Sequence, residues 1–121
     1  MNQRQRLLVV DDSADTRATL SGYLDRIGYR ARFASSGEQA LTMLRDGLET
    51  DGVVYDDATR PAMGGGAFMR QLRSDGKLTP VLLMTKPFQL LDFGDRLLRM
   101  WADQARTVSA PGSAASTAES R

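Results

Sequence analysis

The chain of 121 residues contains no cysteine and no histidine. It therefore has no disulfide and no thiol nucleophile, and it lacks the commonest general base and metal ligand of proteins. The net charge of +1 gives no indication of a nucleic acid or a membrane surface as partner. No apolar run is long enough to span a bilayer, and the first residues show no signal-peptide pattern, so we expect a cytoplasmic protein.

Strands and helices are expected to alternate along most of the sequence. Short apolar runs predict strands at residues 7–10, 29–33, 52–57 and 81–84. Apolar side chains at helical spacing predict helices at about residues 14–27, 67–73 and 89–104, and a capping box of Ser36 and Gln39 opens a further helix. The glycine triplet at residues 64–66 is interpreted as a flexible turn. This alternation predicts an α/β fold, in which helices cover both faces of a parallel sheet.

The composition changes near the end of the sequence. From Arg106 onward serine, alanine, glycine, proline and threonine dominate, and bulky apolar residues nearly vanish. Such a segment cannot bury enough apolar surface to offset the entropy that ordering costs. We therefore expect a folded domain at residues 1–104 and a disordered tail at residues 105–121.

Carboxylates follow two of the expected strands. Asp11 and Asp12 come directly after the first strand, and Asp56 and Asp57 end the strand that begins near Val53. The carboxyl ends of parallel strands meet at one edge of the sheet, where open α/β folds bind ligands. Carboxylates at this edge suit a divalent cation, and beside a cation one carboxylate can act as nucleophile toward a phosphoryl group. The alternative is a set of solvated strand-end residues, which is disfavoured because the carboxylates would repel one another.

Five segments in a fixed order resemble the receiver domain of two-component response regulators. They are LLVVDDS, ASSGEQAL, VVYDDATRPAMGG, TPVLLMT and KPF, and the resemblance as a whole covers about residues 6–104. The resemblance implies a flavodoxin-like doubly wound parallel sheet, here reduced to four strands in the order 2-1-3-4, with four helices. It also implies a signalling module and not an enzyme.

The resemblance implies a role for each residue of the expected phosphorylation site. Asp57 matches the phosphoryl acceptor, because Pro61 lies four residues later, as in the family pattern. Asp56 is the alternative acceptor, although neighbouring side chains on a strand point to opposite faces. Thr85 matches the hydroxyl that contacts a phosphoryl oxygen, and Lys86 matches the ammonium that pairs with the acyl phosphate.

Magnesium is the cofactor that the resemblance implies. Asp11 and Asp12 match the acidic pair that helps to hold Mg²⁺, Asp57 adds a third carboxylate, and the backbone carbonyl of Thr59 matches a further ligand. Mg²⁺ binds through a few carboxylates, a phosphate oxygen and retained waters, so this set of donors suits it.

The sequence departs from the family between Thr85 and Lys86. A helix and a fifth strand usually separate these two residues, but here they are adjacent, so the fourth helix and the fifth strand are missing. Neighbours on an extended chain point to opposite sides, and Pro87 restricts Lys86 to extended conformations. We therefore expect a phosphoryl group on Asp57 to be less well stabilised than in a complete receiver.

The missing strand also predicts self-association. The Val81–Thr85 strand becomes an apolar edge of the sheet without protecting charges. The last helix carries a wide apolar stripe, whose members are Leu90, Leu91, Phe93, Leu97, Leu98, Met100 and Trp101. This stripe is broader than one sheet face requires, so we expect a homodimer through the final helix and the Val81–Thr85 edge.

The leading functional hypothesis is a single-domain response regulator that accepts a phosphoryl group on Asp57. Its expected partners are a sensor histidine kinase or a phosphotransfer protein and an unidentified protein target, without nucleic acid or membrane. One alternative is a degenerate receiver that serves as a phosphorylation-independent dimerisation or scaffolding module. Another is a receiver piece of a hybrid sensor kinase, with the tail as linker.

Overall fold

The computed structural model describes residues 5–57, 63–85 and 89–109. The chain divides into two compact units, Met1–Phe88 and Gln89–Arg121. The elements of the first unit are β1 (Arg6–Val10), α1 (Ala14–Arg26), β2 (Arg30–Ala34), α2 (Gly37–Arg45), β3 (Gly52–Asp56), α3 (Gly65–Ser74) and β4 (Val81–Met84). The described part of the second unit is one long helix, α4 (Leu90–Ser109).

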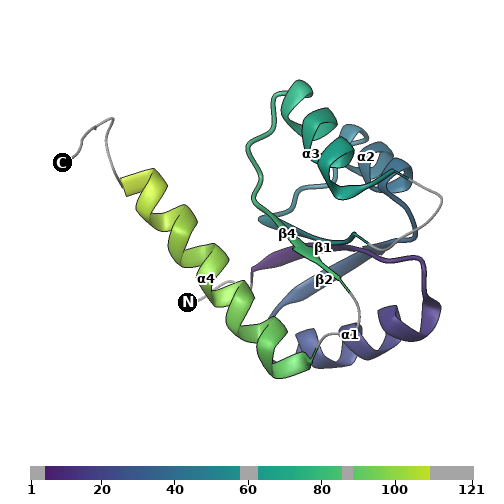
Figure 1. Cartoon of the computed structure of the whole chain (residues 1–121), viewed down its shortest axis with the longest axis vertical. Coiled ribbons are helices and arrows are strands. Elements are labelled where there is room, and N and C mark those ends of the chain that lie inside the picture. The colour runs from purple at the N-terminus through teal and green to yellow at the C-terminus, as the bar shows by residue number, and fades with distance from the viewer. Residues whose placement is uncertain (1–4, 58–62, 86–88, 110–121) are drawn as a thin grey trace. The chain divides into compact units, whose positions relative to one another are not determined.

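The four strands form one parallel sheet in the order β2-β1-β3-β4. In Figure 1 helices α2 and α3 cover one face of this sheet, and α1 lies on the other. The observed order, together with the four helices in the described ranges, confirms the fold that the sequence predicts. Since all strands are parallel, their carboxyl ends meet at one edge.

Local signals set the starts of two helices. The Ser13 hydroxyl accepts a hydrogen bond from the Thr16 amide at 3.2 Å and caps α1. The Ser36 hydroxyl likewise accepts from the Gln39 amide at 3.0 Å and caps α2. The expected capping box is only half formed, because the Gln39 side chain accepts from the amide of Ser35 at 2.6 Å.

Two helix boundaries differ from the prediction. Helix α3 begins at Gly65, so part of the glycine triplet is helical and is not a flexible turn. Helix α4 ends at Ser109, five residues after the predicted end at Gln104. Alanine and arginine at positions 105 and 106 are good helix formers, so the first residues of the expected tail continue the helix. Residues 110–121 lie outside the described residues.

The main core lies between the sheet and the helix pair α2–α3. Its buried members are Leu8, Val10, Ala34, Ala40, Leu41, Leu44, Val53, Tyr55, Phe68 and Leu72. The rings of Tyr55 and Phe68 are the largest of these side chains, and their centroids lie 4.7 Å apart. This contact joins the end of β3 to the first turns of α3, so the core fixes the helix beside the carboxyl edge of the sheet.

Strand β4 forms one edge of the sheet within the described residues, as expected. The carbonyl groups of Pro80 and Met84 accept from Val53 and Asp57 of the β3 side at 2.9 and 2.8 Å. The backbone N–H and C=O groups of successive residues along a strand point to opposite sides. Those of Val81 and Leu83 therefore point away from β3. The first three side chains of β4 are half-buried.

Helix α4 has one buried and one exposed side. Phe93 and Leu97 are buried, whereas Leu91 and Leu98 are 80% and 63% exposed. The predicted apolar stripe therefore includes both buried side chains and two leucines that face solvent. None of the helices in the described ranges combines the length and apolar character that crossing a membrane requires.

Candidate functional site

Asp11 is fixed at the end of β1 by its neighbours. Its carboxylate accepts a hydrogen bond from the Ser13 amide at 2.8 Å, and its own amide donates to the Ala34 carbonyl at 3.0 Å. The Arg17 guanidinium on α1 donates to the Asp11 carbonyl at 2.7 Å, a contact that sequence analysis did not predict. Asp11 is buried and Asp12 is exposed, so the pair spans the boundary between the core and solvent.

Three carboxylates converge at the carboxyl edge of the sheet. One oxygen from each of Asp11, Asp12 and Asp56 lies within 4.8 Å of the other two. Asp56 is 4% exposed, so solvent screens the negative charge of its carboxylate only weakly. Carboxylate oxygens are the hard donors that Mg²⁺ and Ca²⁺ prefer, and a cation would offset the mutual repulsion. The donor set therefore fits a divalent metal ion.

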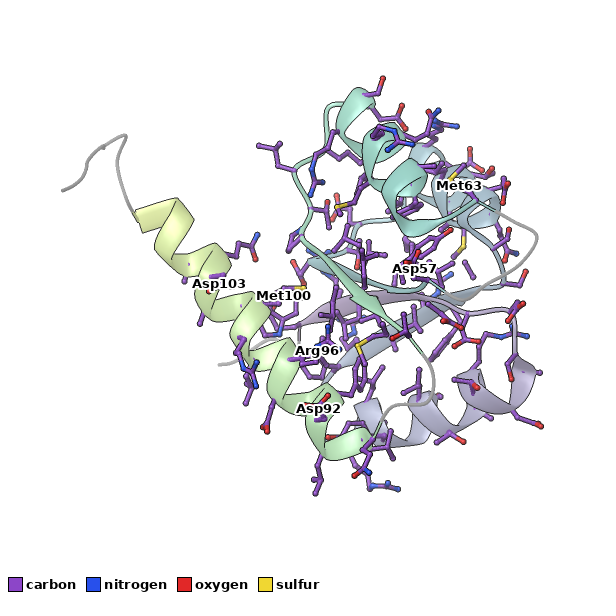
Figure 2. All side chains as sticks on the ribbon, viewed as in Figure 1. Asp57, Met63, Asp92, Arg96, Met100 and Asp103 are labelled. Carbon is purple, nitrogen blue, oxygen red and sulfur yellow. The ribbon has the colours of Figure 1, made fainter. Side chains whose placement is uncertain are left out.

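Asp57 directly follows β3 and lies beside the start of α3. Its Oδ1 atom accepts a hydrogen bond from the Gly65 amide at 2.7 Å, at the first residue of α3. Figure 2 shows Asp57 between the sheet and α3, with Met63 on the segment that enters the helix. Side chains alternate along β3, so Asp57 shares the α3 face with Tyr55, while Asp56 shares the other face with Val54.

The acidic cluster and the expected metal site share two residues, Asp11 and Asp12. Sequence analysis placed Asp57 with Asp11 and Asp12 in the metal site, and the three carboxylates that converge in the structure are those of Asp11, Asp12 and Asp56. The assignment of Asp57 as a metal ligand stays a prediction. The assignment of Asp57 as phosphoryl acceptor stays a prediction.

The segment between β3 and α3 is anchored at two points. The Tyr55 hydroxyl donates a hydrogen bond to the Met63 carbonyl. Burial, followed by the negative charges of Glu38, Asp57 and Asp56, raises the pKa of Tyr55 to about 12, so the hydroxyl keeps its proton at neutral pH. The second anchor is the hydrogen bond between Gly65 and Asp57.

Gly65 is the residue whose importance the sequence analysis missed. A Cβ atom at this position would lie 2.9 Å from Asp57 Oδ1 and 2.5 Å from Leu83 Cδ2. Glycine therefore permits the backbone to approach the carboxylate closely enough for the hydrogen bond. The signal was present, because Gly65 ends the third of the five segments that resemble receivers.

The remaining predicted site residues are only partly described. Thr85 is exposed and directly follows Met84, which is the register partner of Asp56. It therefore lies at the same edge of the sheet as the carboxylates. Thr59 and Lys86 lie outside the described residues.

Curated relatives share sequence with this chain over part of their length. The chain is 34% identical over 91 residues to the probable transcriptional regulator ycf27 of Porphyra purpurea, covering 75% of the chain and 36% of that protein. It is 38% identical over 80 residues to the response regulator MprA of Mycobacterium sp. (strain KMS), covering 66% of the chain and 34% of that protein. The chain thus spans only about a third of the length of these relatives.

A solved structure and a family comparison agree with these relatives. The chemotaxis response regulator CheY4 of Vibrio cholerae superposes with a TM-score of 0.71 at 26% identity, covering 81% of this chain and 99% of that chain. The response regulator receiver domain family matches residues 7–103, which include the acidic cluster and nearly all described elements. Carboxylates line one edge of the four-stranded parallel sheet. The chain that carries them belongs to the response regulator receiver domain family.

Proposed function

We propose that this chain accepts a phosphoryl group on Asp57 and transmits the change through protein contacts. The observation that supports this most directly is the acidic cluster of Asp11, Asp12 and Asp56, which lies at the sheet edge next to Asp57. A cation held there would offset the negative charge that develops on the phosphoryl oxygens during transfer.

The proposed reaction is a nucleophilic displacement. A carboxylate oxygen of Asp57 attacks phosphorus, a mixed anhydride forms, and the bond from phosphorus to the donor breaks, so that the donor leaves with the electron pair. The hydrogen bond from the Gly65 amide to Oδ1 holds the Asp57 carboxylate in one orientation. This sequence has no histidine, so a phosphohistidine donor must lie outside it, as in a sensor histidine kinase or a phosphotransfer protein.

A small phosphodonor tests the proposal without knowledge of the kinase. Incubation with radiolabelled acetyl phosphate and Mg²⁺ is expected to label the chain, and excess EDTA is expected to prevent labelling. The label should be released by mild alkali and by hydroxylamine, because an acyl phosphate is a reactive mixed anhydride. Absence of any Mg²⁺-dependent label would favour the degenerate receiver that acts independently of phosphorylation.

A second candidate function, dimerisation, is favoured by two exposed leucines. Leu91 and Leu98 lie seven residues apart and therefore on the same side of α4. We propose that a second copy of this chain covers them, with the open edge of β4 as a further contact. Leu97 is buried, so the substitution Leu97→Asp would disturb folding and is not a suitable probe of the interface.

Leu98→Glu is expected to convert the dimer to a monomer, because it places a charge in an apolar contact that excludes water. Light scattering coupled to size exclusion at micromolar concentration measures the mass. Leu78→Glu is the matched control, since Leu78 is 83% exposed and lies between α3 and β4. A wild-type monomer at every concentration would contradict dimerisation.

The chain spans about a third of the length of its curated relatives, so a role within a longer protein stays open as an alternative.

A further inference from the structure

We propose that the outer edge of β2 binds an extended segment of a partner protein as an additional strand. The segment carries acidic side chains on one face and apolar side chains on the other. Strand β2 is the last strand of the sheet on the side opposite to β4. The inference goes beyond the proposed function, because it concerns a different part of the molecule and does not require a phosphoryl group on Asp57.

The backbone of β2 offers hydrogen-bonding groups to an added strand. In the ladder with β1, the Arg30 amide donates to the Gln5 carbonyl at 2.9 Å. The polar groups of successive residues point to opposite sides, so those of Ala31 and Phe33 point away from β1. Within the described ranges, the structure gives these outward groups no hydrogen bond. An exposed strand edge of this kind can pair with an extended peptide through its main chain.

A cavity of about 540 Å³ lies along this edge. Residues 30–32 of β2 line it, and because neighbouring side chains point to opposite faces, the cavity is bounded from both faces of the sheet. On the α1 face its wall is made of small residues, Ser21, Gly22 and Ala31, and a Cβ atom at Gly22 would have no heavy atom within 4 Å. This face therefore has room for apolar side chains of an added strand.

Two guanidinium groups make the other face of this edge positive. Leu8 is the register partner of Arg32 and belongs to the core beneath α2 and α3, so Arg32 and, two positions away, Arg30 point to that face. Both are exposed, and neither guanidinium forms an ion pair or a hydrogen bond with a residue that the structure describes. Carboxylates at every second position of an added strand would lie opposite them, a cross-strand arrangement that stabilises a sheet.

The carboxylates around the cavity do not neutralise these two arginines. Glu49 and Asp51 pair with Arg6, at 3.2 and 3.0 Å. Asp25 also lines the cavity, but it belongs to α1, on the opposite face of the sheet. A second copy of this chain is an unfavourable occupant, because pairing of two β2 edges would bring arginines near arginines. The edge therefore suits a partner of opposite charge.

Fluorescence anisotropy with a labelled peptide of alternating glutamate and valine tests the inference on the intact chain. The peptide is expected to bind wild type, and Arg32→Glu is expected to weaken binding at least about tenfold, because an attractive cross-strand pair becomes repulsive. Arg70→Glu is the matched control, since it makes the same change at an exposed position of α3 that does not line the cavity. It is expected to alter binding by less than about twofold.

A second peptide and a second measurement separate strand addition from attraction between charges. Proline in place of the central valine removes a backbone donor, so this peptide is expected to bind at least about tenfold more weakly at the same net charge. Hydrogen exchange followed by NMR is expected to show new protection of the amides of Ala31 and Phe33 in the complex, whereas the Arg30 amide is already bonded to β1.

Absence of binding at about 1 mM of the glutamate–valine peptide would overturn the inference. Equal binding of the proline peptide would overturn it too, because charge alone would then account for the attraction. The same holds for equal losses in Arg32→Glu and Arg70→Glu, and for protection that appears on β4 and not at Ala31 and Phe33. Labelling of wild type by acetyl phosphate decides separately whether the proposed function holds.

Discussion

Asp57→Asn is expected to abolish phosphoryl incorporation, whereas Asp56→Asn is expected to retain it at a higher Mg²⁺ concentration. The amide of asparagine is a poor nucleophile toward phosphorus, so the loss at position 57 should reach background. Asparagine can still accept the hydrogen bond from the Gly65 amide, which leaves the start of α3 intact. At position 56 the substitution removes one of the three carboxylates that converge, and we expect about tenfold more Mg²⁺ for half-maximal labelling.

Labelling by acetyl phosphate over a series of Mg²⁺ concentrations separates these two effects. Asp46→Asn serves as the control for a change of one charge at a distance from the cluster. Equal incorporation in wild type and Asp57→Asn would move the acceptor elsewhere, with Asp56 as the next residue to test. Incorporation that disappears in Asp56→Asn even at saturating Mg²⁺ would point to the same reassignment.

The order of the strands was predictable because it depends on signals that short stretches of sequence carry. Apolar runs separated by amphipathic helices are typical of a parallel sheet, and the absence of a strand between Thr85 and Lys86 follows from their adjacency. The hydroxyl cap at Ser36 also formed as predicted, because it needs only a hydroxyl and an amide three residues later. These features depend on near neighbours in the chain.

The arrangement of the site was less predictable, because it depends on residues that are distant in sequence. The alternation along β3 guarantees that Asp56 and Asp57 point apart, but only the packing of Tyr55 against Phe68 settles which face each occupies. The role of Gly65 depends likewise on the approach of α3 to Asp57 and Leu83. A family pattern that aligns Asp57 with an acceptor predicts its chemistry, and the fold of this chain gives the direction of its side chain.

The contact between α3 and the sheet links the stability of the fold to the geometry of this site. Phe68 is fully buried, and its ring centroid lies 4.7 Å from that of Tyr55 at an interplanar angle of 34°. Tyr55 in turn donates to the Met63 carbonyl at the entrance to α3. A change at Phe68 should therefore affect both the free energy of unfolding and the position of the Gly65 amide.

Phe68→Ala is expected to lower the free energy of unfolding by about 3–5 kcal/mol, because it removes a buried ring and leaves a cavity beside Tyr55. The total for a domain of this size is about 5–15 kcal/mol, so the variant should be close to its unfolding limit at room temperature. Urea unfolding followed by circular dichroism measures the change. Phe68→Leu should cost less because it keeps more of the apolar volume, and Leu78→Ala, at an 83% exposed position, should change stability by no more than about 0.5 kcal/mol. A loss below about 1 kcal/mol in Phe68→Ala would mean that α3 does not depend on this contact for its position beside Asp57.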